Sequence, residues 1–173
     1  MRIFLCLIAI TFFSSCGSTY VDYDYDKNVD FSNYKTYAYD FERITGFTEF
    51  DEKRFTKAID SVLESRGWSF SETPDVLITA HSKDYETQSR NTLGVGVGSG
   101  GGNVGVGVSG GIPIGGREQH RDLTVTIYDE KTNSAIWEAL SESDLKIKAT
   151  PEQKDAYFAK LVSKIFKNYP PEK

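Results

Sequence analysis

The chain has 173 residues, of which 25 are acidic and 20 are basic, for a net charge of −5 at neutral pH. This length suits one domain, and the 13% of aromatic residues can supply one hydrophobic core. The excess of carboxylates makes the protein a poor candidate for binding nucleic acid, whose phosphates need clustered lysines and arginines.

The N-terminal segment has the pattern of a bacterial lipoprotein signal. Arg2 precedes an apolar stretch of 11 residues, Ile3–Phe13, which is too short to span a bilayer but matches the hydrophobic region of a signal peptide. Two serines follow, and then Cys16, whose thiol can accept a thioether-linked lipid. We therefore expect residues 1–15 to be removed and Cys16 to carry the lipid that anchors the protein to a membrane.

Loss of Cys6 with the signal and acylation of Cys16 would leave the mature chain without a free thiol. Disulfides, thiol catalysis and cysteine metal sites are therefore excluded. The next residues, Gly17 and Ser18, lack the aspartate that retains some lipoproteins in the inner membrane and the charged run that marks surface export. We expect the protein in the cell envelope of a Gram-negative bacterium, anchored to the outer membrane and facing the periplasm.

Residues 16–30 are polar and acidic, and this composition predicts a lipidated tether before a folded domain at 31–170. Within the tether, Asp22, Asp24 and Asp26 alternate with tyrosines. Three such carboxylates can contribute to a calcium site, but the ion usually takes about six or more oxygen ligands, and the rest of the calcium-loop pattern is missing. We therefore predict no metal.

The first half of the domain reads as strand, helix, strand. Residues 31–39 are rich in aromatic and β-branched side chains, which favour a strand. A helix then follows Asp51 as its N-cap, with apolar residues at helical spacing, and Gly67 can close it in the left-handed conformation. Residues 76–81 form an apolar run bounded by turn formers, which is typical of an internal strand.

The second half reads as a hairpin and a helix. Residues 123–128 alternate strictly between apolar and polar side chains, and 135–140 return as the antiparallel partner after a tight reversal. The run Thr150-Pro151-Glu152-Gln153 is a capping box with proline in the first helical position. The helix that it begins ends before Pro170.

This element order, β-α-β-(glycine-rich hairpin or loop)-β-β-α, predicts an α+β fold: a small sandwich of about four mostly antiparallel strands with two helices on one face. The core residues expected from the buried stripe or face of each element are Ile59, Val62, Leu77, Val125, Ile127, Leu161 and Ile165. The other sheet face would carry Tyr37, Tyr39, His81 and Trp137, a candidate interaction surface that the insert or the tether could also cover.

The insert at 93–116 has 12 glycines in 24 residues and no charged side chain. Its composition is typical of disorder, yet valine and glycine alternate on either side of residues 99–102, which is the pattern of a flat hairpin. Such a hairpin is marginal alone and needs a surface to lie on. We expect its valines to dock on the protein's own sheet, on a partner or at the membrane interface; these are Val95, Val97, Val104, Val106 and Val108.

Motifs in the insert that resemble enzyme signatures fail on context. Residues 96–101 and 105–110 both satisfy GxGxxG, but no helical pattern follows either copy to bind a pyrophosphate. Ser109 lies in a GxSxG string, with His120 too close downstream to leave room for the usual strand-turn-helix order of a hydrolase. His81 is the other histidine. We predict no cofactor and no catalytic residues.

Three stretches together resemble a known family: VDFSNYKTYAYDF, SRGWSFSETPDVLITAHSKD and LTVTIYDEKTNSAIWEALSESDL. They are similar to the bacterial envelope family called domain of unknown function 4136 (DUF4136), across nearly all of the mature chain. Tyr39 stands where the family usually has tryptophan, and Glu138-Ala139 where a basic residue and glycine are commoner. The resemblance implies an α+β envelope lipoprotein and brings no known activity, substrate or catalytic residue.

These observations favour a lipid-anchored periplasmic protein that is not an enzyme. Its expected role is a binding or scaffold module whose partner, an envelope protein or a lipid, the sequence does not identify. The alternative is an accessory for outer-membrane assembly or lipid binding, and a hydrolase is less favoured because no catalytic set is coherent.

Overall fold

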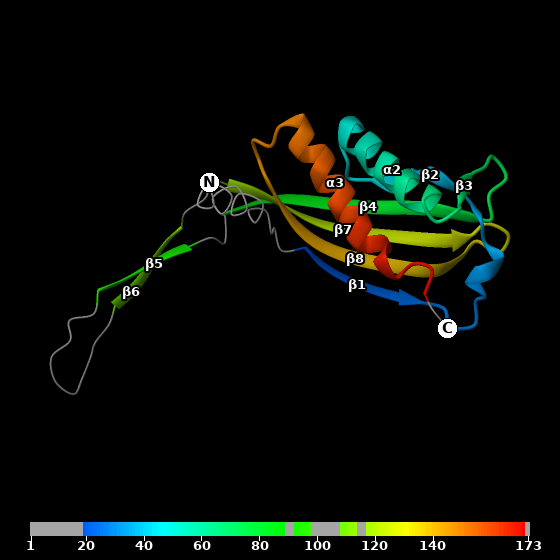
Figure 1. Ribbon diagram of the computed structural model, residues 1–173, viewed down its shortest axis with the longest axis horizontal. Helices are drawn as coiled ribbons and strands as arrows, with labels where there is room; N and C mark the ends of the chain where they lie inside the picture. Colours follow the sequence, from blue (N-terminus) through cyan, green and yellow to red (C-terminus); the bar gives the residue numbers. More distant parts are fainter. Residues whose placement is uncertain (1–18, 89–91, 98–107, 114–116, 172–173) are drawn as a thin grey trace, which may run out of the picture.

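A mixed α+β architecture is seen in the computed structural model, which describes residues 19–88, 92–97, 108–113 and 117–171. Two helices, α2 (Glu49–Glu64) and α3 (Pro151–Ile165), lie side by side on one face of a six-stranded sheet (Figure 1). The strands of that sheet are β1 (Tyr20–Tyr25), β2 (Thr36–Thr45), β3 (Ser69–Phe70), β4 (Val76–Gln88), β7 (Arg117–Asp129) and β8 (Ser134–Lys146). Single turns of 3-10 helix, η2 (Phe31–Asn33) and η3 (Phe166–Asn168), precede β2 and follow α3.

The sheet runs in the order β1-β8-β7-β4-β2-β3. Strands β2 and β4 are parallel and are joined through α2, whereas β4, β7, β8 and β1 pair antiparallel. The β7–β8 pair is the hairpin expected at 123–140, and both strands are longer than expected. The α+β class and the two helices on one face are therefore confirmed, but the expected count of about four strands is too low.

The strands missed from the sequence are β1 and β3. Residues 20–25 were assigned to a tether, but they form edge strand β1, which pairs with β8 from Tyr20–Glu142 to Tyr25–Trp137. Tyrosine and aspartate alternate in this segment with the period of two that is typical of a strand. Because tyrosine is itself partly polar, the two faces differ little in hydrophobicity, and the strand was not recognised. Strand β3 has two residues, too few to show any period.

Local capping explains where both helices begin. The capping box at Thr150 is confirmed, because its hydroxyl accepts from the Gln153 amide while the Gln153 side chain accepts from the Thr150 amide. The N-cap of α2, however, is Thr48 and not Asp51. Thr48 accepts from the Asp51 amide, which leaves the buried Asp51 carboxylate free to bind charged side chains.

The core fills the space between the helices and the sheet. Even-numbered β4 residues such as Ile78 pack there against Val125 and Ile127 of β7, and against Ile59 and Leu161 of the helices. Of the other residues expected in the core, Ile165 is buried, whereas Val62 is partly buried and packs against the edge of the core. Leu77 was expected in the core, but its odd number places it on the opposite face of β4, and it does not belong to the buried cluster.

Part of the glycine-rich insert forms a separate two-stranded antiparallel sheet of β5 (Thr92–Val97) and β6 (Val108–Pro113). This β5–β6 hairpin extends beyond the end of the main sheet at which β4 ends and β7 begins (Figure 1). Its register pairs Leu93 with Ile112 and Val97 with Val108, which centres the connection about two residues later than the sequence symmetry suggested. Val104 and Val106 lie outside the described residues.

Within the described residues, no helix is both long and apolar enough to cross a membrane.

Candidate functional site

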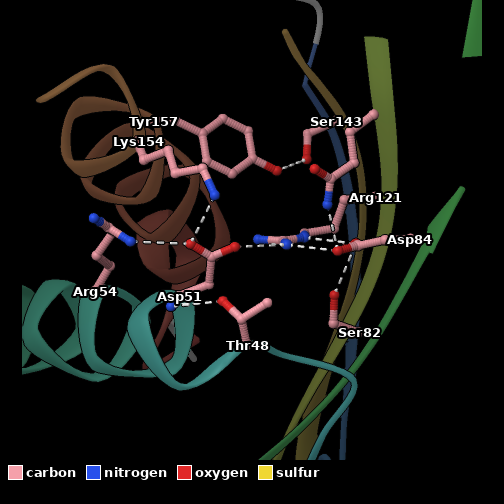
Figure 2. Close-up of polar contacts among 10 residues, drawn as sticks. Thr48, Asp51, Arg54, Ser82, Asp84, Arg121, Ser143, Lys154 and Tyr157 are labelled. Carbon is pink, nitrogen blue, oxygen red and sulfur yellow. Dashed lines mark hydrogen bonds and ion pairs between the residues drawn. The ribbon is translucent and has the colours of Figure 1, made fainter. Parts of the chain in front are cut away.

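A buried charged cluster lies where the first turns of α2 and α3 meet the sheet (Figure 2). We define it by the five residues Asp51 and Arg54 of α2, Asp84 of β4, Arg121 of β7 and Lys154 of α3. Asp51 and Arg121 are each 2% exposed. The cluster therefore joins five charged side chains from four elements at one end of the molecule.

Arg121 is the centre of this cluster. Its Nε and Nη2 donate to the two carboxylate oxygens of Asp84, at 2.7 Å each, and Nη2 also lies 3.4 Å from Asp51. Burial alone would raise the pKa of the Asp84 carboxyl, but its hydrogen bonds to Arg121 and the charge of that guanidinium outweigh burial and hold the pKa below its usual range. Asp84 is therefore ionised at neutral pH.

Aromatic rings enclose the guanidinium of Arg121. Its central carbon lies 5.4 Å from the ring centre of Phe47, 5.0 Å from that of Phe158 and 5.9 Å from that of Tyr157. These distances are in the range of cation–π attraction. The rings exclude water, and Nη1 of Arg121 is buried without a hydrogen-bond partner.

The remaining contacts complete the cluster as a structural connection between the layers. Asp51 accepts from Arg54 at 3.2 Å and from Lys154 at 3.4 Å, and Arg54 also donates to Asp155 of α3 at 2.8 Å. The three cations of the cluster thus face its two carboxylates and Asp155, which is 66% exposed beside it. The chemistry of this arrangement is to fix both helix starts on the sheet, since a buried charge tolerates only one geometry of its partners.

Sequence reasoning missed this cluster, although one signal was present. Arg121 precedes Leu123 and Val125 at intervals of two, so it shares their buried face in a strand. A charged side chain at such a position needs a buried counter-charge, and sequence alone does not say that Asp84 lies opposite it.

The histidines are held in separate polar contacts. His120 is 4% exposed, and its Nδ1 and Nε2 lie 2.5 Å from Asp144 and 3.3 Å from Asp122. His81 bonds through Nδ1 to the Thr45 hydroxyl at 2.8 Å. Ser109 lies in β6 opposite Gly96, in the separate hairpin. Among the described residues, no group of three or more histidine, cysteine or acidic side chains could hold a metal ion.

The alternating aspartates of β1 bind the backbone of their own strand. Asp22 accepts from the Tyr23 amide at 2.9 Å, and Asp24 accepts from the Tyr25 amide at 2.8 Å. Asp26 instead accepts from the amide of Asn28 at 2.9 Å, in the turn after the strand. These contacts account for the carboxylates that were considered for calcium.

The expected aromatic surface of Tyr37, Tyr39 and Trp137 is wrong, because these side chains lie on the helix-covered face. Tyr37 is 0% and Trp137 1% exposed. The hydroxyls of Tyr37 and Tyr39 both donate to Asp60 of α2, at 2.7 and 2.6 Å. The prediction assigned the odd-numbered residues of β2 to the wrong face of the sheet. The alternation of side chains along a strand does not by itself say which face is buried, because that depends on the partner strand.

The opposite face, away from the helices, is polar and acidic. We call it the open sheet face and define it by Asp22 and Asp24 of β1, Asp122 of β7, and Glu138, Leu140 and Glu142 of β8. Leu140 is 50% exposed at its centre, opposite Asp22 on one side and Thr124 on the other. Two pairs of like charges stand directly opposite each other, Asp24–Glu138 and Asp122–Glu142. Lys83 of β4 stands opposite Asp122 on its other side, so Asp24–Glu138 is the destabilising pair that a contacting cation would relieve.

Comparison with known families identifies the domain. The family described as "Domain of unknown function (DUF4136)" matches residues 21–171. The chain belongs to the DUF4136 family. No curated protein matches it.

Two solved structures are similar to this DUF4136 domain to different degrees. A PDZ domain protein from Parabacteroides distasonis is similar with a TM-score of 0.52 and 17% identity, over 95% of this chain and 40% of that one. The chain thus spans less than half of that protein, and the likeness concerns the fold alone. A PelC dodecamer from Paraburkholderia phytofirmans has a TM-score of 0.48 and 10% identity, over 86% of this chain and 95% of that one.

One further hollow lies at the end of the DUF4136 domain opposite the charged cluster. This cavity of about 290 Å³ is lined by Phe31, Trp68, Pro170 and Pro171, together with Asp30, Ser32, Tyr34 and Lys35. Its lining is mainly aromatic and proline carbon and brings together no set of groups that suggests catalysis.

Proposed function

We propose that this protein is a lipid-anchored, non-catalytic binding or scaffold module of the cell envelope. The observation that carries the proposal is the position of β1, which begins at Tyr20, four residues after Cys16. A fully extended chain covers about 3.5 Å per residue, so a lipid on Cys16 lies within about 14 Å of the sheet. Such a domain is held at the membrane surface and not at the end of a long tether.

The open sheet face is the surface through which this module contacts a partner. It combines an exposed Leu140 with carboxylates on three neighbouring strands, so apolar and charged contacts are available together. Interfaces commonly have this arrangement of an apolar centre and a polar rim. The partner that complements it is an envelope protein with a basic surface.

The geometry of the polar side chains supports a non-catalytic role. His120 is 4% exposed and both of its ring nitrogens face carboxylates, so it is held beneath the surface and away from a substrate. The cations and carboxylates of the charged cluster are likewise engaged with each other beneath the helices. These groups stabilise the fold and are not arranged for proton transfer to a substrate.

The lipid anchor is tested by Cys16→Ala in growing cells fed an alkyne-tagged fatty acid. The natural protein should incorporate the tag and float with membranes, whereas the variant should lose both properties almost completely, because several acyl chains bind far more firmly than one. Equal labelling of the two proteins would contradict the assignment of Cys16.

The binding surface is tested by photocrosslinking in the same cells. A photoreactive phenylalanine replaces Leu140 on the open sheet face, and the matched control replaces Ser61, an exposed residue on the outer side of α2. We expect a discrete crosslinked product from position 140 and none of the same mass from position 61. Identical products from both positions would reject the open sheet face as the specific contact.

A further inference from the structure

Large apolar side chains gather at one end of the domain. We call this the anchor end and define it by Tyr20, Phe50, Tyr85 and Ile147, which are 63%, 70%, 46% and 39% exposed. They come from β1, the first turn of α2, β4 and the loop after β8. Isolated exposed apolar residues are ordinary, but four from separate elements at one end form a surface.

The strand register places these side chains at the same end. Tyr85 lies opposite His120, and Tyr20 lies opposite Glu142, two residues before the position on β8 that faces His120. The Ile147 amide donates to the Arg117 carbonyl, at the first residue of β7.

The position of Phe50 at this end follows from the contacts of the next residue in the sequence. Asp51, the next residue in α2, contacts Arg121, which stands opposite Asp84 and one residue from His120. Phe50 therefore lies next to the charged cluster on the helix-covered side, whereas Tyr85 follows Asp84 in β4 and points to the opposite face of the sheet.

The β5–β6 hairpin leaves the sheet at this same end. Strand β4 ends at Gln88 opposite Arg117, and the hairpin continues from there, with Thr92 opposite Pro113 (Figure 1). The sequence from 93 to 116 has no charged residue. An uncharged extension thus projects from the part of the domain that exposes the most apolar side chains.

The short chain between Cys16 and β1 indicates that the anchor end contacts the membrane. A lipid on Cys16 can lie no more than about 14 Å from Tyr20, so the bilayer must pass close to this strand start. The middle of the open sheet face, at Asp22, Asp24 and Glu138, carries carboxylates, which anionic lipids repel. The anchor end instead offers tyrosines and a phenylalanine, the side chains that favour the boundary between lipid and water.

We propose that the anchor end and the β5–β6 hairpin lie on the lipid surface of the membrane that holds Cys16. This orientation rests on the proposed lipid anchor. The insert valines were expected to dock on the protein's own sheet, on a partner or at the membrane interface, and the proposal selects the membrane interface. Backbone groups along the outer edges of this two-stranded sheet need hydrogen-bond partners, so the hairpin lies at the boundary between headgroups and the upper acyl chains and does not cross the hydrocarbon. The domain then stands on this end, with the open sheet face turned toward the periplasm.

The experiment measures tryptophan quenching in vesicles that contain the lipidated full-length protein. Single variants Phe50→Trp, Tyr85→Trp and Val97→Trp report on the anchor end and the hairpin. Phe70→Trp is the matched control, since Phe70 is 58% exposed on β3 near the opposite end. The vesicles contain phosphatidylethanolamine and phosphatidylglycerol, with or without phosphatidylcholine brominated in the upper part of its acyl chains. The natural Trp68 and Trp137 are buried and provide the background.

We expect bromolipid to quench the three test variants at least about twofold more than Phe70→Trp and the unmodified protein, because quenching requires near contact with the acyl chain. Quenching equal to the control in a protein that floats with the vesicles would overturn the orientation and leave the lipid anchor intact. A protein that carries no lipid and does not float would overturn both. Quenching at positions 50 and 85 but not at 97 would remove the hairpin from the lipid surface.

Discussion

Removing Asp84 should destabilise the protein more than removing Arg121, its partner. Asp84→Ala deletes both 2.7 Å hydrogen bonds to a guanidinium that is 2% exposed. Arg121 then keeps a single contact with Asp51 at 3.4 Å and stays enclosed by aromatic rings. Breaking a buried ion pair in this way costs about 3–5 kcal/mol. Because the Asp84 side chain is 24% exposed, we expect a value near the lower limit, about 3 kcal/mol.

Arg121→Met leaves a less severe defect. Asp84 is partly exposed and retains hydrogen bonds from Gln119 and Ser82, while Asp51 retains Arg54 and Lys154. A methionine side chain also suits an aromatic enclosure. We therefore expect a cost of about 1–2 kcal/mol for Arg121→Met, and a similar cost for the double variant, since neither leaves a buried cation unpaired.

The assay is urea unfolding of the mature chain, followed by the fluorescence of the buried Trp68 and Trp137. At neutral pH the coupling between the two substitutions should be about 2–3 kcal/mol. Because the pKa of Asp84 is lowered in the folded protein, its contribution is present above the unfolded pKa of about 4 and is lost as the pH falls below it. The difference between natural protein and Asp84→Ala should therefore narrow in acid. The reasoning is refuted if Asp84→Ala costs no more than Arg121→Met at neutral pH.

Two further predictions use the same unfolding measurement. Gly46 and Gly67 both have positive φ, but a Cβ added at Gly46 would lie 1.7 Å from the Ser82 carbonyl oxygen, whereas a Cβ added at Gly67 would have no atom within 4 Å. We therefore expect Gly67→Ala to lower the free energy of unfolding by about 1 kcal/mol and Gly46→Ala by about 3 kcal/mol or more. Equal costs for the two variants would contradict the close approach at Gly46. Burial, with the hydrogen bond to Asp129 at 2.7 Å, raises the pKa of Tyr34 to about 12, so its stabilisation is complete below pH 10 and is lost as the pH rises toward 12. The stability difference between natural protein and Tyr34→Phe should shrink over that interval, and a constant difference would show that the hydroxyl does not titrate with unfolding.

The sequence predicted those elements whose signals are local. The helix start at Thr150 depends on residues three positions apart, and the β7–β8 hairpin on alternation across a short turn, so both were placed correctly. The α+β class follows from the order of such elements. The family resemblance is confirmed over 21–171 because its motifs are likewise short runs of residues.

Features that depend on distant partners could not be predicted in the same way. Strand β1 is defined by β8, more than 100 residues later, and its one apolar face, of Val21, Tyr23 and Tyr25, is mostly tyrosine. The faces of β2 depend on its pairing with β4, which places Tyr37 opposite Val76 and Tyr39 opposite Ile78, on the face that the helices cover. Asp51 offers a chemically sound N-cap, and only the position of Arg121 explains why Thr48 caps the helix in its place.

The alternating aspartates of β1 also limit how the protein can associate. The Asp26 amide bonds to β8, so the amides of Tyr23 and Tyr25 point outward along the free edge. Asp22 and Asp24 accept from those amides, which leaves fewer donors for an added strand. The opposite edge, β3, has two residues and offers little more. The β1 edge therefore disfavours strand addition, and the open sheet face and the anchor end are the surfaces to which we assign contacts with other molecules. Tyr20 lies opposite Glu142 at the margin of the open sheet face, whereas Glu138 and Leu140 lie farther along β8, so a domain that stands on the anchor end can still bind a periplasmic partner through the rest of that face.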